Sequence, residues 1–169
     1  MLNRPTAVRT LALSLLLGWA AAANAQTAAP FELTGPSLDG KATSLAALRG
    51  KVVMLVYWRT DCAVCRDKMP ELRANAQGWR GRPFELLLVN ADRQRADLLA
   101  YDQTVAALLP AEQRFTTLWR GDPSYRDSLA ALPARWPLTL VIDPRGHVAA
   151  RFEGRIPAEA WDRIADLLP

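Results

Sequence analysis

Three stretches that consist mostly of apolar residues stand out in the hydrophobic pattern, over residues 51–58, 84–90 and 138–142. Stretches of this length that are rich in valine, leucine and isoleucine predict strands that are covered on both faces. Residues 143–146, Asp-Pro-Arg-Gly, predict a tight turn with proline at its second position. Residues 147–153 then alternate between apolar and polar side chains, which predicts an antiparallel strand.

Helical spacing of apolar residues separates these strands. The longest helical pattern covers residues 62–79, and Pro70 should kink that helix. Further elements are predicted as follows: a short strand over 31–33, a turn at Gly35-Pro36, a short helix from Ser44 to Leu48, a helix over 93–109 that turns Leu98, Tyr101, Val105 and Leu108 inward, a short strand over 115–118, a helix over 122–131 with Asp122 as its cap, and a helix from Pro157 to Leu168.

Strands that alternate with helices, followed by a hairpin and a closing helix, predict one α/β domain over residues 26–169. The expected architecture has three layers, α/β/α, with a central mixed sheet and helices on both of its faces.

The first 25 residues have the three parts of a secretory signal peptide. Arg4 and Arg9 give a positive start, residues 11–23 are apolar and uncharged, and Ala23-Asn24-Ala25 is a small-residue cleavage site. The alternative is a signal that is retained as a membrane anchor, for which the apolar run is short. We therefore expect a periplasmic or otherwise extracytoplasmic protein.

The charge pattern disfavours nucleic-acid binding. The formal net charge is +4 at pH 7, and the arginines are interspersed with acidic residues instead of forming a basic block. Basic and aromatic side chains are not interleaved as they are on RNA-binding surfaces. We expect a solvated charged surface and no nucleic-acid partner.

The two cysteines of the chain, Cys62 and Cys65, form a Cys-x-x-Cys pair at the junction of a predicted strand and a predicted helix. Unpaired N–H groups and the helix dipole stabilise a thiolate at such a helix start, and the thiolate is the form that attacks disulfides. A structural disulfide would close a very short loop and would therefore stabilise the fold little. A metal site would need more ligands, and the single histidine, His147, lies in a predicted turn. Redox chemistry is the favoured interpretation of the three, and no metal is expected.

Several motifs occur in a characteristic order: residues 45–51 before the first buried strand, Tyr57-Trp58 ahead of Cys62-x-x-Cys65, Pro70 five residues after the second cysteine, and Trp136-Pro137 six residues before Asp143-Pro144-Arg145-Gly146. This order resembles the thioredoxin superfamily, and within it the exported TlpA/ResA type, over most of residues 31–168. The resemblance implies a thioredoxin-like fold and thiol–disulfide exchange without a bound cofactor.

The resemblance also implies roles for individual residues. Cys62 attacks the partner protein, and the more deeply buried Cys65 resolves the mixed disulfide. Pro137 is expected to have a cis peptide bond that places the backbone of Trp136 beside Cys62, where a partner segment can pair with it. Trp58 and Trp136 are expected to flank Cys62 and to form an apolar docking surface with it.

The implied partners are proteins that carry thiols or disulfides. The resemblance favours a reductant that is itself kept reduced by a membrane electron donor and that acts in cytochrome c maturation or in the assembly of metal sites. This direction of electron flow depends on the resemblance and not on the residues themselves.

Two positions next to the cysteine pair depart from the family pattern. Asp61 stands where the family usually has tryptophan, and its carboxylate should raise the pKa of Cys62, while Arg59 and Arg66 should lower it. Lys68 stands where the family often has glutamate. We hypothesise that Lys68 supports the thiolate electrostatically, although an exposed helix lysine without this role is the more common case.

A third departure concerns the buried acid of classical thioredoxins. Its place falls on Val56, which cannot titrate, so the sequence offers no obvious general base.

Two other functions occur on this fold. A peroxiredoxin-like peroxidase would carry the pattern P-x-x-x-T-x-x-C, whereas Thr60 is only two residues before Cys62 and the proline is missing. A copper-delivery protein would use two cysteines with a spacing one residue longer and a distal histidine, and His147 is expected to be remote.

Overall fold

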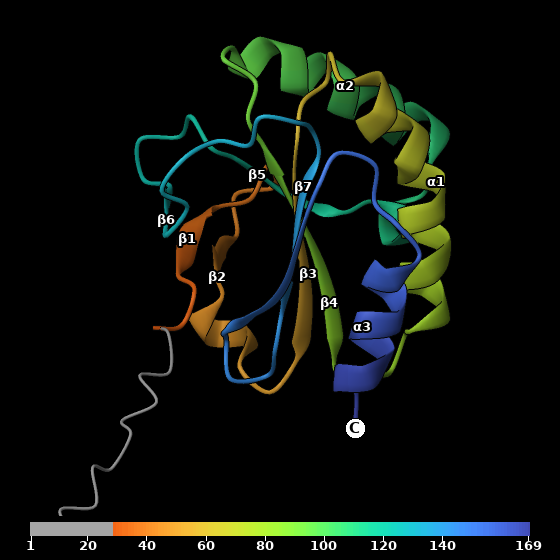
Figure 1. Cartoon of the computed structure of the whole chain (residues 1–169). Coiled ribbons are helices and arrows are strands. Elements are labelled where there is room, and N and C mark those ends of the chain that lie inside the picture. The colour runs from red at the N-terminus through yellow and green to blue at the C-terminus, as the bar shows by residue number, and fades with distance from the viewer. Residues whose placement is uncertain (1–28) are drawn as a thin grey trace, which may run out of the picture.

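The computed structural model describes residues 29–169, so the predicted signal peptide over residues 1–25 and the predicted start of the domain at residue 26 lie outside the described residues. A five-stranded sheet with the strand order β5-β4-β3-β7-β8 forms the centre of the structure (Figure 1). Its strands are β3 (Val52–Trp58), β4 (Phe84–Asn90), β5 (Thr116–Trp119), β7 (Leu138–Ile142) and β8 (Val148–Glu153).

The central sheet is mixed, as predicted. Strands β3, β4 and β5 run parallel to one another, whereas β7 is antiparallel to β3 and β8 is antiparallel to β7. Every residue of β3 and of β7 is buried, which is why their sequences are apolar at all positions but Thr139 and do not alternate.

Three α-helices cover one face of the central sheet: α1 (Ala63–Gly78), α2 (Arg95–Leu108) and α3 (Glu159–Leu167). Their buried side chains, among them Met69, Leu98 and Ile164, pack in one cluster with Met54 and Val56 of β3. Both right-handed crossovers, β3–α1–β4 and β4–α2–β5, advance in the same direction along the sheet and therefore place α1 and α2 on the same face. None of the helices within residues 29–169 combines the length and the apolarity that crossing a bilayer requires.

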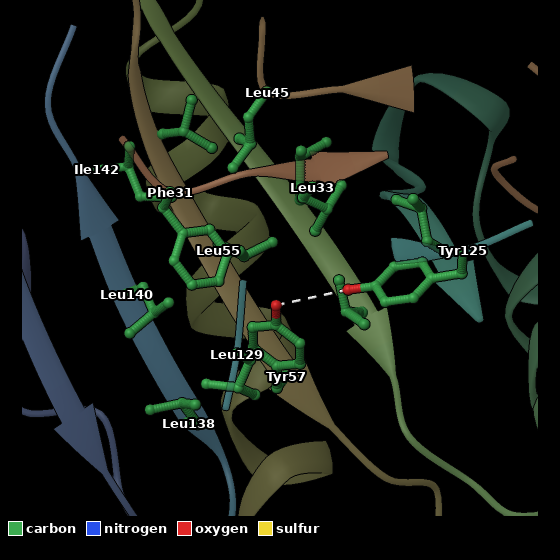
Figure 2. Packing of buried hydrophobic residues seen from close by; sticks show 14 residues of the cluster. Phe31, Leu33, Leu45, Leu55, Tyr57, Tyr125, Leu129, Leu138, Leu140 and Ile142 are labelled. Atoms are coloured by element: carbon green, nitrogen blue, oxygen red, sulfur yellow. Dashed lines mark hydrogen bonds between the residues drawn. The ribbon is translucent and has the colours of Figure 1, made fainter. Parts of the chain in front are cut away.

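The opposite face of the sheet is covered by a second, small sheet with the order β2-β1-β6 (Figure 1). Its strands are β1 (Leu33–Pro36), β2 (Ala42–Ser44) and β6 (Arg126–Asp127), and a 3-10 helix, η1 (Ala46–Leu48), follows β2. Leu33 and Leu45 pack there against Leu55, Tyr57 and Leu140 of the central sheet (Figure 2). Three layers are therefore present, but the layer opposite the three α-helices is this small sheet and not the predicted helices.

Three local predictions were wrong. Residues 122–131 do not form a helix: they form a turn, in which the Asp122 carboxylate accepts the Ser124 N–H at 2.9 Å, followed by β6. The predicted turn at Gly35-Pro36 is part of β1, which pairs on both sides with β2 and β6. Leu108, predicted to point inward, is 76% exposed at the end of α2.

Candidate active site

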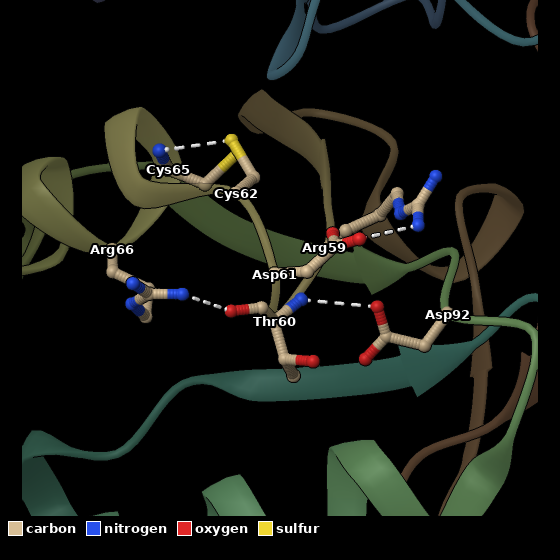
Figure 3. Close-up of a disulfide and its surroundings, with 7 residues drawn as sticks. All are labelled: Arg59, Thr60, Asp61, Cys62, Cys65, Arg66 and Asp92. Carbon is tan, nitrogen blue, oxygen red and sulfur yellow. Dashed lines mark hydrogen bonds and ion pairs between the residues drawn. A yellow bond between two sulfur atoms is a disulfide. The ribbon is translucent and has the colours of Figure 1, made fainter.

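The candidate active site is a disulfide between Cys62 and Cys65 at the corner where β3 leads into α1 (Figure 3). The two Cα atoms are 5.2 Å apart. Cys65 is buried in the first turn of α1, with 2% of its surface exposed, whereas Cys62 is half-buried before the helix starts. Cys65 therefore lies deeper than Cys62, as predicted, whereas contact of Cys62 with a partner stays a prediction.

Cys62 takes the position of the helix N-cap. Its sulfur accepts the backbone N–H of Cys65 at 3.1 Å, which is the contact that a serine or aspartate oxygen makes in most caps (Figure 3). After reduction, the same N–H and the helix dipole stabilise a thiolate on Cys62. This capping geometry is what the predicted nucleophile role of Cys62 requires, and that role stays a prediction.

The turn before Cys62 is closed by a hydrogen bond from the Cys62 N–H to the Arg59 carbonyl at 3.3 Å. Within this turn the Arg59 guanidinium binds the Asp61 carboxylate at 2.6 Å and lies 5.9 Å from the centre of the Trp136 ring. The structure thus brings Arg59, Asp61 and Trp136 together and shows that the charge of Asp61 is directly compensated by Arg59.

Trp136 and Pro137 lie at the same end of the central sheet as the disulfide. Their peptide bond is cis, as predicted. Leu138, the next residue, pairs with Tyr57 of β3, which places Pro137 level with the end of that strand. Trp136 is half-buried and packs against the same cluster as Cys62.

Trp58 does not lie on the surface beside Cys62. It is 1% exposed, packs edge to face on Tyr101 with 4.9 Å between ring centroids, and belongs to the core beneath α1. The predicted docking surface of Cys62, Trp58 and Trp136 is therefore corrected, because Trp58 supports the site from below and is not available for contact.

Lys68 forms an ion pair with Glu71 at 2.6 Å along α1. The hydrogen bond from Lys68, followed by one from the indole N–H of Trp161 at 3.0 Å, lowers the pKa of Glu71. The positive charge of Lys68 is thus largely engaged by Glu71, and its predicted influence on the thiolate stays a prediction.

His147 lies far from the disulfide, after the turn between β7 and β8. That turn is level with the beginning of β3, since Val53 pairs with Ile142, whereas Cys62 follows the other end of the strand. Nδ1 of His147 lies 3.7 Å from the Asp143 carboxylate. Within residues 29–169, no three His, Cys, Asp or Glu side chains are grouped so that they could hold a metal ion.

One further residue of the site was not predicted from the sequence. Asp92 follows β4, is only 6% exposed, and accepts the Thr60 N–H through its carboxylate at 3.0 Å (Figure 3). The position of Asp92 directly after a buried strand was a usable signal, because the carboxyl ends of the parallel strands β3 and β4 meet at one edge of the sheet. A polar residue just after a buried strand therefore belongs near the turn that follows the neighbouring strand.

Residues 25–159 match the family model described as the AhpC/TSA family. The chain belongs to the AhpC/TSA family. A search of curated proteins finds no match to this AhpC/TSA-family chain.

Solved structures similar to this AhpC/TSA-family protein share its fold. A thiol:disulfide interchange protein of the thioredoxin family from Chlorobium tepidum is 22% identical, with a TM-score of 0.61, 82% of this chain and 92% of that chain covered. StoA from Bacillus subtilis is 15% identical, with a TM-score of 0.60 and coverage of 82% and 99%. The exposed lipoprotein thioredoxin Etrx1 from Streptococcus pneumoniae is 21% identical, with a TM-score of 0.59 and coverage of 82% and 100%. These likenesses confirm the predicted thioredoxin-like α/β fold.

The family match, the thioredoxin-like fold and the Cys-x-x-Cys disulfide together support a thiol–disulfide oxidoreductase.

Proposed function

We propose that this thiol–disulfide oxidoreductase exchanges its Cys62–Cys65 pair with thiols and disulfides of partner proteins and acts as a reductant. One observation carries the proposal: the disulfide joins a half-buried Cys62 that caps α1 to a Cys65 that is buried one turn into the helix. A sulfur pair that closes so short a loop stabilises the fold little and suits reversible opening.

The exchange proceeds in two displacements. The Cys62 thiolate attacks one sulfur of the partner's disulfide, the partner's sulfur–sulfur bond breaks, and one partner thiolate leaves. The Cys65 thiol loses its proton and attacks the Cys62 sulfur of the mixed disulfide, which releases the second partner thiolate. Two electrons pass to the partner, the two partner thiolates take up the protons that the cysteines lost, and the Cys62–Cys65 disulfide remains.

Two features of the sequence support the reductive direction. The signal-like pattern of residues 1–25 supports an extracytoplasmic location, where a membrane electron donor would have to restore the dithiol. The resemblance to the TlpA/ResA type favours cytochrome c maturation or metal-site assembly as the process served. The half-buried Trp136 beside the cis peptide is proposed to receive the partner segment.

A trapping experiment tests the proposal. In the full chain expressed with its natural leader, Cys65→Ser should accumulate mixed disulfides with partner proteins, because the resolving sulfur is missing. Non-reducing electrophoresis and mass spectrometry identify the adducts, and dithiothreitol should release them. The matched control Cys62→Ser should accumulate far fewer, because its remaining thiol is buried.

Peroxide consumption separates the proposal from the peroxidase alternative. We expect the reduced protein to reduce disulfide substrates such as insulin and to consume hydrogen peroxide slowly in comparison. Rapid peroxide consumption without trapped proteins, or a disulfide that strong dithiol reductant cannot open in the folded protein, would overturn the proposal.

A further inference from the structure

The carboxylate of Asp92 is buried next to the active-site turn and is fixed by several contacts. One carboxylate oxygen accepts the Thr60 N–H at 3.0 Å, and the other accepts the Asn90 side-chain amide at 3.0 Å. The backbone of Asp92 is fixed as well, because its N–H donates to the Asn90 side chain at 3.0 Å and its carbonyl accepts the Trp119 indole at 2.9 Å.

Among the residues that the structure describes, no cation pairs with this carboxylate at short range. The ion pairs formed among residues 29–169 do not include Asp92. A buried carboxylate without a paired cation is costly, and a neutral side chain could accept the Thr60 N–H instead. Its presence at this point therefore calls for a role that uses the charge.

A cation approaches the turn from the other side. The Arg66 guanidinium, in the first turns of α1, donates to the Thr60 carbonyl (Figure 3). The N–H and the carbonyl of Thr60 are thus held by side chains of opposite charge, one from the end of β4 and one from α1. Thr60 lies two residues before Cys62 in the turn that the Cys62 N–H closes onto Arg59.

We infer that Asp92 is a positioning residue for the redox reaction, which holds the turn that carries Cys62 and whose charge disfavours the Cys62 thiolate. This inference rests on the proposed function. The disulfide is neutral, so the Asp92 carboxylate leaves it nearly unaffected, whereas it repels a second negative charge that forms nearby at low dielectric. Asp92 therefore shifts the equilibrium from the dithiol toward the disulfide and makes the protein a stronger reductant, while Arg66 acts in the opposite direction.

Residue substitutions separate the charge of Asp92 from its hydrogen bond. Asp92→Asn keeps an oxygen that can accept the Thr60 N–H and removes the charge. The matched control is Asp97→Asn, which removes an equal charge at an exposed position in the first turn of α2. Reduced full-length protein is titrated by thiolate absorbance and by the pH dependence of iodoacetamide alkylation. Its redox equilibrium with glutathione is then measured by mass spectrometry.

We expect the acid dissociation constant of Cys62 to rise roughly tenfold in Asp92→Asn, which is a fall of its pKa by about one unit. The glutathione equilibrium should shift toward the dithiol by a similar factor. Asp97→Asn should change neither. Arg66→Met should shift both quantities in the opposite direction. If Asp92 and Arg66 only held Thr60 in place, either substitution would shift the pKa of Cys62 and the glutathione equilibrium in the same direction.

The inference is overturned if folded Asp92→Asn stays within twofold of the wild type in both measurements. Circular dichroism establishes that the variant is folded. If Asp92→Asn does not fold, Arg66→Met decides, and an unchanged or lowered pKa of Cys62 in that variant overturns the inference. No partner protein enters these measurements, so their failure is distinct from a failure to trap partners with Cys65→Ser.

Discussion

At the scale of single residues, the site is governed by charges that are paired within the turn before Cys62. The sequence predicted opposite effects of Asp61 and Arg59 on the thiol but could not rank them, because the ranking depends on where the two side chains point. The structure joins them at 2.6 Å, so each screens the other from the sulfur. The pair is partly exposed to solvent, which limits the effect of either charge.

Substitution of Arg59 and substitution of Asp61 should therefore shift the pKa of Cys62 in opposite directions. Arg59→Met leaves the Asp61 carboxylate uncompensated and should raise the pKa of the thiol by several tenths of a unit, on the order expected for an exposed charge a few ångströms away. Asp61→Asn should lower it by a similar amount. Thiolate absorbance as a function of pH measures both variants.

The double variant Arg59→Met/Asp61→Asn is the control, and its thiol pKa should return close to that of the wild type. Equal shifts of the same sign in both single variants would contradict the expectation. The same titration applied to Lys68→Met tests the hypothesis that Lys68 supports the thiolate. An unchanged pKa of Cys62 in that variant would discard the hypothesis.

At the scale of elements, continuous apolar runs predicted strands well and local capping signals predicted one helix wrongly. Strands β3, β4 and β7 coincide with their predicted ranges to within one residue, because burial on both faces leaves no room for another pattern. Residues 122–131 begin with the helix-start signal Asp-Pro, yet they do not form a helix. The buried contacts of Asp127, whose side chain is 3% exposed, determine their conformation instead. One of its partners, Tyr57, lies 70 residues away along the chain and cannot be found from local sequence patterns.

Asp127 joins the small sheet to the central sheet. Its carboxylate accepts the hydroxyls of Tyr57 at 3.0 Å and of Tyr125 at 2.7 Å, and the Arg120 guanidinium at 3.1 Å. It also accepts the Leu129 N–H at 3.0 Å. The chain after Arg120 is therefore held against β3 by one buried anion, and β6 forms where a helix was expected.

Removal of this anion should destabilise the protein strongly. Asp127→Ala leaves two hydroxyls and a guanidinium without their acceptor, and we expect the free energy of unfolding to fall by about 3–5 kcal/mol. Tyr125→Phe removes one donor and should cost about 1–2 kcal/mol. Urea unfolding followed by circular dichroism measures both. Asp122→Ala, in the exposed turn nearby, is the control and should change stability much less, so equal losses in Asp122→Ala and Asp127→Ala would contradict this role.

At the scale of the whole molecule, the active site combines three chain segments that only the sheet order brings together. The cysteine pair was evident from spacing, and the cis Trp136–Pro137 bond followed from the family register. Asp92 can be placed only after β4 is paired with β3 in parallel register, because its contact with Thr60 depends on that pairing and not on the residues around Asp92. Likewise, the three α-helices all lie on one face of the central sheet because of the strand order, which the sequence did not reveal.

The packing of the two sheets also predicts how stability responds to alkaline pH. Tyr57 and Tyr125 lie in the apolar cluster between the two sheets (Figure 2). Burial, as the largest cause, raises the pKa of each above its ordinary value, and the neighbouring Asp127 charge adds to this. In the unfolded chain both tyrosines ionise near pH 10, whereas the folded chain keeps them protonated, so their stabilisation is complete below about pH 10 and is lost as the pH rises further. The expected slope is about 1.4 kcal/mol per pH unit for each tyrosine, measured by urea unfolding at a series of pH values with tyrosinate absorbance as a second probe. In the variant Tyr57→Phe/Tyr125→Phe only the lysines and Tyr101 remain to titrate, so its free energy of unfolding should decline less steeply with pH. A decline as steep as that of the wild type would contradict the assignment to Tyr57 and Tyr125.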